Sequence, residues 1–139
     1  MDKKIIDFIN EHHVLTLATS VDDIPYVSNC FYIYLEDENM LVCTSDKTTK
    51  HIKDVEQNST VGASIVLETK AVGKIQGLQI NGTMTEAKDK LLSKCKKRYL
   101  MKYPYAVLKL TTMWTIEINF AKLTDNRLGF GTKLIWEKE

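Results

Sequence analysis

Two stretches of regular alternation between apolar and polar residues constrain this chain more than any other feature. Every second residue is apolar between Val61 and Leu67, and the same alternation runs from Trp114 to Phe120. A period of two places successive side chains on opposite faces of a strand, whereas a helix would repeat every 3.6 residues. We therefore predict a mainly β protein whose strands each bury one face.

The same criteria predict six or seven strands separated by turns. They cover residues 14–20, 26–35, 40–44, 61–67, 75–86, 114–120 and, as a short last strand, 133–136. Apolar residues at helical spacing predict three short helices, at residues 2–12, after Thr44 and at residues 87–101. This order suggests a small antiparallel β-barrel with helices packed at its openings.

Length and composition indicate one domain that spans residues 1–139. The 139 residues are 44% hydrophobic and 27% charged, which is the mix of a soluble domain with a genuine core. Nineteen basic and eighteen acidic residues leave a formal charge of +1, so the overall field does not favour nucleic acid or an anionic membrane surface. Any anion site must therefore be local.

The cysteines and the apolar pattern predict the compartment. Cys30, Cys43 and Cys95 are an odd number, with no Cys-x-x-Cys spacing, and two of them lie in strand patterns. We expect buried thiols in a reducing cytoplasm. The sequence has no signal-peptide core and no apolar stretch near 18 residues, so we expect neither secretion nor a membrane span.

The segment from Thr44 to Lys50 carries the clearest chemical signal. Thr44 and Ser45 close a strand, and Asp46 or Thr48 can cap a helix, so Thr48, Thr49 and Lys50 are expected in its first turn. Unpaired amides and the positive end of the helix dipole favour a bound anion there. A lysine, at position 47, 50 or 53, could add a charge. The alternative is an ordinary capped helix with a solvated lysine face.

The order of several short motifs resembles the flavin-binding split-barrel superfamily typified by pyridoxamine 5′-phosphate oxidase. The motifs are His-Val-Leu-Thr-Leu-Ala-Thr from His13, Thr-Ser-x-Lys-Thr-Thr-Lys-His from Thr44, Asn-Ser-Thr-Val from Asn58 and Gln-Ile-Asn-Gly from Gln79. The closing run from Leu123 to Trp136 is similar to an uncharacterised bacterial subfamily of that group. These stretches together span most of the chain.

The resemblance implies a homodimer that holds FMN in grooves between its two chains. Thr44 and Ser45 would supply hydroxyl and amide donors, and Thr48, Thr49 and Lys50 would hold the phosphate. Beside the flavin ring the family uses the second strand, which corresponds here to Ser28 and Asn29. A glutamine of the partner chain also contacts the flavin, with Gln76 the first candidate and Gln79 the second. Lys133, in the C-terminal loop region, is a further candidate.

Departures from the oxidase pattern limit what the resemblance implies. The family's Arg-x-Val-x-x-Lys is replaced by the run from Tyr26 to Tyr32, and the Arg-Lys pair at the helix start is reduced to Thr49-Lys50. Each lost charge-assisted phosphate contact contributes about 1.5 to 3 kcal/mol, so flavin binding could be weakened by an order of magnitude or more. The Arg-x-His signature for the vitamin substrate is also absent, so we do not predict pyridoxamine phosphate oxidation.

Three histidines allow other interpretations. His12 and His13 could bind metal or haem, as some split-barrel relatives do, but a helix C-terminal histidine near the dipole is the simpler interpretation. His51 either faces the phosphate or occupies a packed or solvated helix position. No Ser/His/Asp or Cys/His set can be assembled, so no catalytic residue and no metal ligand is assigned.

The sequence thus predicts an FMN-binding protein that acts as a flavin-dependent oxidoreductase on an unidentified small substrate. The cofactor would carry the redox chemistry while the protein positions it. A first alternative is a non-catalytic module that stores or senses a flavin, another phosphorylated ligand or haem. A second is an interaction domain whose groove stays empty. Turnover with NAD(P)H and an acceptor would distinguish the enzyme from the binding module.

Overall fold

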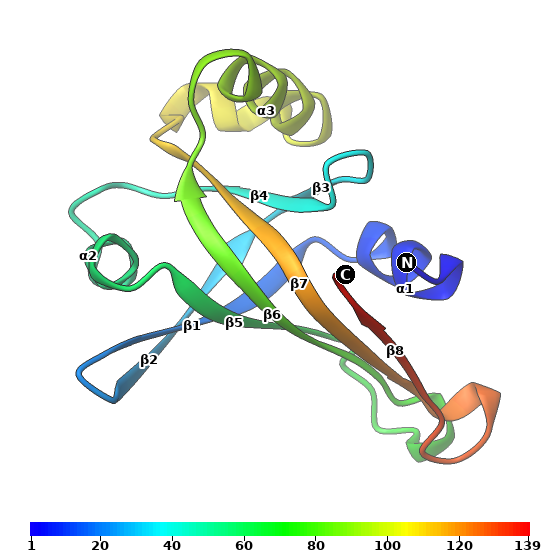
Figure 1. Cartoon of the computed structure of the whole chain (residues 1–139). Coiled ribbons are helices and arrows are strands. Elements are labelled where there is room, and N and C mark those ends of the chain that lie inside the picture. Colours follow the sequence, from blue (N-terminus) through cyan, green and yellow to red (C-terminus); the bar gives the residue numbers. More distant parts are fainter.

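A single curled sheet dominates the computed structural model, which describes all residues from 1 to 139 (Figure 1). Its eight antiparallel strands are β1 (Val14–Val21), β2 (Ile24–Phe31), β3 (Ile33–Leu35), β4 (Met40–Thr44), β5 (Thr60–Val66), β6 (Gln76–Glu86), β7 (Met113–Asp125) and β8 (Lys133–Glu137). The helices are α1 (Lys3–Glu11), α2 (Lys50–Gln57) and α3 (Asp89–Lys102), with short 3-10 turns η1 (Val72–Lys74), η2 (Pro104–Lys109) and η3 (Asn126–Leu128). The predicted mainly β architecture is confirmed.

The connectivity makes this sheet a split barrel. The strands follow the order β2-β1-β5-β6-β7-β4-β3. β8 lies outside this order and pairs with β7. β2 and β3 stand at opposite ends of that order, yet only Tyr32 separates them in the chain. The sheet must therefore curl until its ends meet, while β2 and β4 form no ladder and leave the barrel open between them.

The eighth strand arises because the predicted strand of residues 26–35 changes partners at Tyr32. Its first part pairs with β1 up to Phe31, and its second part pairs with β4 from Ile33 onward. The backbone N–H of Tyr32 donates to the carbonyl of His13 over 3.0 Å, and its hydroxyl donates to the carbonyl of Ile9 over 2.7 Å. The long predicted strand is thus two strands, which were counted as one.

Two apolar clusters hold the helices on the sheet. The larger has 22 buried residues and joins the inner faces of the strands to Ile5, Phe8 and Ile9 of α1 and to Ile52 and Val55 of α2. The smaller has seven buried residues and lies under α3. In Figure 1, α2 and α1 lie on opposite sides of the curled sheet and α3 lies above it. None of the helices has the length and apolarity that a bilayer span requires.

The edge strand β2 leaves apolar side chains in solvent. Ile24, Val27 and Phe31 are 66%, 63% and 54% exposed. Scattered exposed apolar residues are normal, but several on one edge strand form the kind of surface that proteins usually cover.

Candidate functional site

The loop between β4 and α2 fixes the backbone at the centre of the predicted phosphate site. The N–H of Ser45 donates to the carbonyl of Thr112 over 3.0 Å, and the carbonyl of Ser45 accepts from the indole N–H of Trp114 over 3.0 Å. The Thr44 hydroxyl lies 2.8 Å from the Thr111 hydroxyl. The strand end is therefore held on both sides, and Ser45 turns its hydroxyl toward α2.

The turn that follows is built on Asp46 and starts α2 slightly later than predicted. The Asp46 carboxylate accepts the N–H and hydroxyl of Thr48 over 2.7 and 2.6 Å, and these bonds lower the pKa of Asp46. The N-cap position is Thr49 instead of Asp46 or Thr48, so Thr48 and Thr49 precede the first helical residue, Lys50, instead of lying in the first turn. The cause is local, because the carboxylate stabilises an Asx turn instead of capping the helix.

The first amides of α2 are available for a ligand. The first helical bond runs from the N–H of Lys53 to the carbonyl of Thr49 over 3.1 Å, so the N–H groups of residues 50–52 precede it and have no helical acceptor. The Thr49 side chain caps none of them and donates instead to the carbonyl of Asp46 over 2.8 Å. The helix therefore presents free donors and its positive dipole end.

Lys50 is the first residue of α2, and its ammonium pairs with a carboxylate one turn along the helix. Its ammonium lies 3.0 and 3.1 Å from the two carboxylate oxygens of Asp54 and 4.8 Å from the centre of the Tyr26 ring. Asp54 is buried and also accepts from the Thr19 hydroxyl over 2.9 Å, and its pKa is lowered chiefly by Lys50. Lys47, by contrast, pairs with Glu86 over 3.1 Å.

His51 contacts Ser45, an arrangement that sequence reasoning missed. Its Nε2 atom lies 2.6 Å from the Ser45 hydroxyl and 3.4 Å from the Thr49 hydroxyl. Burial lowers the pKa of His51 against the opposing effect of Asp54, so the ring is neutral at pH 7. The sequence spacing of Ser45 and His51 does not predict this contact, because the contact depends on the turn between the two residues.

Ser28 and Asn29 point to opposite faces of β2. The Ser28 hydroxyl is buried and has no hydrogen-bond partner, and strand alternation puts Ser28 on the same face as Tyr26, which Lys50 covers. Asn29 lies on the other face, where its side-chain oxygen accepts from the Thr16 hydroxyl over 2.8 Å. An unsatisfied buried hydroxyl is uncommon and is consistent with a missing ligand group.

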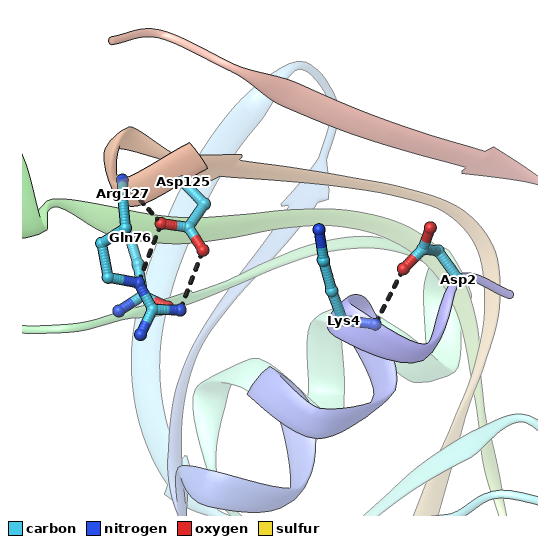
Figure 2. Close-up of polar contacts among 5 residues, drawn as sticks. All are labelled: Asp2, Lys4, Gln76, Asp125 and Arg127. Carbon is cyan, nitrogen blue, oxygen red and sulfur yellow. Dashed lines mark hydrogen bonds and ion pairs between the residues drawn. The ribbon is translucent and has the colours of Figure 1, made fainter. Parts of the chain in front are cut away.

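Gln76 and Lys133 lie away from this cluster in the chain. Gln76 is only 6% exposed and accepts from the guanidinium of Arg127 over 2.8 Å (Figure 2). Lys133 is exposed and opens β8, beyond the polar loop that was predicted to contain it. Gln79, the second candidate, is exposed in the middle of β6. Within one chain, therefore, the structure brings together Thr44, Ser45, Thr48, Thr49 and Lys50, with Ser28 on the strand faced by Lys50.

The histidines and cysteines outside this cluster have local partners. His12 is the C-cap residue of α1, and its Nδ1 atom lies 2.8 Å from the carbonyl of Phe8. The His13 ring stacks on Phe31 at 6.1 Å between centres. All three cysteines are free, and no group of three or more His, Cys, Asp or Glu side chains could hold a metal ion.

Comparison with known proteins assigns the family. The sequence matches the family described as "Pyridoxamine 5'-phosphate oxidase" over residues 1–124. The chain belongs to this family. A relative from Pasteurella multocida (strain Pm70), the UPF0306 protein PM1958, is 29% identical over 138 residues, which cover 99% of this chain and 93% of the relative. The resemblance inferred from the motifs, including the subfamily, is thereby confirmed.

Two solved proteins with the same fold are named for different ligands. A haem-binding protein from Mycobacterium smegmatis has a TM-score of 0.76 at 14% identity, covering 94% of this chain and 57% of its own. An FAD-binding protein from Mesorhizobium loti has a TM-score of 0.72 at 16% identity, covering 88% and 93%. At such identities the likeness establishes the split-barrel fold, and the ligand has to be argued from this chain's residues.

Proposed function

We propose that this member of the family binds FMN and acts as a flavin-dependent oxidoreductase on a small substrate. One observation carries the proposal: the turn between β4 and α2 places the hydroxyls of Ser45 and Thr49 beside the unpaired first amides of α2, and Lys50 is the first residue of that helix. A phosphate monoester satisfies all three kinds of donor at once. Free amides at a helix start are common, so the hydroxyls and the lysine make the feature specific.

Some of these residues would bind the phosphate, and others would hold the loop that presents them. Ser45, Thr49 and the first amides of α2 would bind the phosphate oxygens, and Lys50 would bridge the phosphate and Asp54. Thr44 and Thr48 would hold the loop through their bonds to Thr111 and Asp46. The unsatisfied hydroxyl of Ser28 would then face the ring end of the cofactor.

A second copy of the chain would complete the groove. The exposed apolar face of β2 supports a homodimer, because an interface would cover Val27 and Phe31. Asn29 lies on that outer face and would contact the cofactor or the partner there. Gln76 is buried and held by Arg127, so we propose the exposed Gln79 as the partner's contact, with Lys133 as a further one. The free thiols fit a cytoplasmic protein.

Bound flavin would supply the electron transfer, and the chain's part would be to bind, orient and shield it. The two missing family cations and the missing Arg-x-His signature argue against pyridoxamine phosphate as the substrate. Haem is the alternative ligand, because a haem-binding protein shares the fold. A non-catalytic module for flavin, haem or another phosphorylated ligand is therefore the rival function.

The proposal is tested by adding FMN to the purified protein, removing the free ligand and recording the visible spectrum. We expect a retained flavin band that NAD(P)H or another reductant bleaches. Retention without any reduction would favour the binding module, and retention of added haem but not of FMN would overturn the flavin assignment.

Variants locate the phosphate. Lys50→Ala combined with Thr49→Ala should weaken FMN binding about tenfold or more, because it removes a charge-assisted contact and a hydroxyl donor. Lys53→Ala is the matched control, since Lys53 is an exposed lysine of the same helix. Equal FMN affinity in the unaltered protein, the double variant and the Lys53 variant would contradict the phosphate assignment.

A further inference from the structure

A separate polar cavity lies between α1 and the adjoining ends of β6 and β7. It encloses about 160 Å³, and none of the residues proposed for the flavin phosphate lines it. Its polar walls come from three elements that are distant in the sequence: Lys4, Asp7 and Glu11 from α1, Gln76 from β6, and Asp125 with Arg127 from the β7–η3 junction. An engineered cavity of about 150 Å³ holds benzene, so the space suits a ligand of a few heavy atoms.

A buried carboxylate fixes the arginine of this cavity. Asp125 is 2% exposed, and its two oxygens accept from Nε and Nη2 of Arg127 over 3.1 and 2.9 Å (Figure 2). This fork lowers the pKa of Asp125, so the carboxylate stays charged. Nη1 of Arg127 takes no part in these bonds and keeps its two N–H donors for another group.

Gln76 adds a second preset donor. Its Oε1 atom accepts from Nη2 of Arg127 over 2.8 Å, which fixes the amide orientation because a flipped amide would set two donors against each other. Its Nε2 atom therefore faces away from the guanidinium and has no partner in the chain, although the residue is 94% buried. An amide donor without an acceptor in the chain is free to bind a ligand or water in the cavity.

Lys4 supplies a third donor that its neighbour does not. The ammonium of Lys3 binds both oxygens of Asp7 over 2.7 and 2.6 Å. The ammonium of Lys4 has no such partner, and Figure 2 shows that Asp2 binds only the backbone N–H of Lys4, over 2.8 Å. Lys4 lines the cavity, whereas Lys3 does not.

We propose that this cavity binds a small metabolite through its carboxylate group. The two N–H donors of Arg127 Nη1, the Nε2 group of Gln76 and the ammonium of Lys4 give the cavity donors that a carboxylate accepts. A phosphate dianion fits less well, because three carboxylates line the cavity and repel a second negative charge. Asp7 is paired with Lys3 and Asp125 with Arg127, which leaves Glu11 as the carboxylate without an ion pair. The site is distinct from the proposed flavin site and does not depend on it.

The test is a titration of the isotope-labelled full chain with pyruvate, followed by amide chemical shifts. We expect saturable shifts at Gln76, Arg127 and Leu128, and no comparable shifts at Thr49 or Lys50. Lys4→Gln should weaken binding about tenfold, as expected for the loss of one charge-assisted contact. Lys53→Gln should leave it within about twofold, because Lys53 is an exposed lysine of α2 that does not line the cavity.

Three outcomes would overturn the proposal. They are the absence of saturable shifts at these amides, an equal loss in the Lys4 and Lys53 variants, and tighter binding of inorganic phosphate than of pyruvate. Because the measured amides belong to this cavity, a failure here leaves the FMN experiment unaffected. Both lysine variants keep Asp125 paired with Arg127, so neither should unfold the chain.

Discussion

At the scale of single residues, Gly82 is the position where the fold tolerates no side chain. It lies at the irregularity in the β6–β7 ladder, and a Cβ atom there would lie 2.6 Å from the carbonyl oxygen of Glu117 and 2.7 Å from the Cγ2 atom of Ile116. Because backbone must move, we expect Gly82→Ala to destabilise the protein by about 1 to 3 kcal/mol. Gly73→Ala meets nothing within 4 Å and should be nearly neutral in urea unfolding; equal midpoints for the two variants would contradict the packing at the bulge.

Asp125 gives stability a pH dependence. Its folded pKa is below its usual value of 3.8, so its contribution is complete above that value and is lost as the pH falls through the lowered pKa. Asp125→Asn keeps an acceptor for Arg127 but loses the charge, and should cost about 1 kcal/mol at pH 7, a small value because Arg127 is half-exposed. Urea unfolding should show the difference in stability between the two proteins shrinking as the pH falls below 3.8. A difference in stability that stayed constant with pH would show that the charge of Asp125 does not cause it.

Residue contacts were only partly predictable. Lys50 and Asp54 are four residues apart on one helix, so their ion pair could have been proposed from spacing. The contact between Ser45 and His51 could not, because the Asx turn at Asp46 sets it. Gln76 was selected by the resemblance alone, and nothing in its surroundings signalled the bond to Arg127, which is 51 residues away in the chain.

At the scale of elements, one buried hydrogen bond links α2 to the sheet. The Thr19 hydroxyl of β1 donates to Asp54, which in turn orients Lys50. Thr19→Val keeps the shape and removes the donor, so the thermal midpoint should fall by about 4 °C and FMN binding should weaken with it. Thr60→Val is the control, because Thr60 is an exposed residue at the start of β5 and has no contact with Asp54. Unchanged FMN affinity in the Thr19 variant would show that Asp54 does not position Lys50.

The elements themselves were largely predictable, because alternation reports burial directly. The strand from Met40 to Thr44 was predicted with its observed bounds. β7 was predicted too short, since the alternation of Ala121, Leu123 and Asp125 ends in a buried charged residue that resembles a loop. The break at Tyr32 leaves the alternation intact, so no sequence pattern could reveal that the pairing partner changes there.

At the scale of the whole molecule, the proposed dimer should depend on β2. Val27→Glu places a charge on the exposed apolar face, so it should convert the dimer to a monomer in sedimentation velocity and weaken FMN binding in parallel. Val72→Glu makes the same change at a valine of η1 that is 56% exposed, and should leave the dimer intact. A Val27 variant that stayed dimeric would place the interface elsewhere.

The barrel could be predicted as a whole because the order of its strands and motifs was sufficient to identify the split-barrel fold. The ligand could not, because the same fold is shared with a haem-binding and an FAD-binding protein. Only the phosphate end of the site has residues whose chemistry can be argued in this chain. In the proposed dimer the ring end would depend on a partner chain, and a single sequence carries no pattern for it.

The most direct measurement is therefore a comparison of FMN with riboflavin, which carries the same ring without the phosphate, by calorimetric titration of the purified protein. If the start of α2 holds the phosphate through its amides, hydroxyls and Lys50, FMN should bind about a hundredfold more tightly than riboflavin. Equal affinities, or no binding of either, would contradict the account.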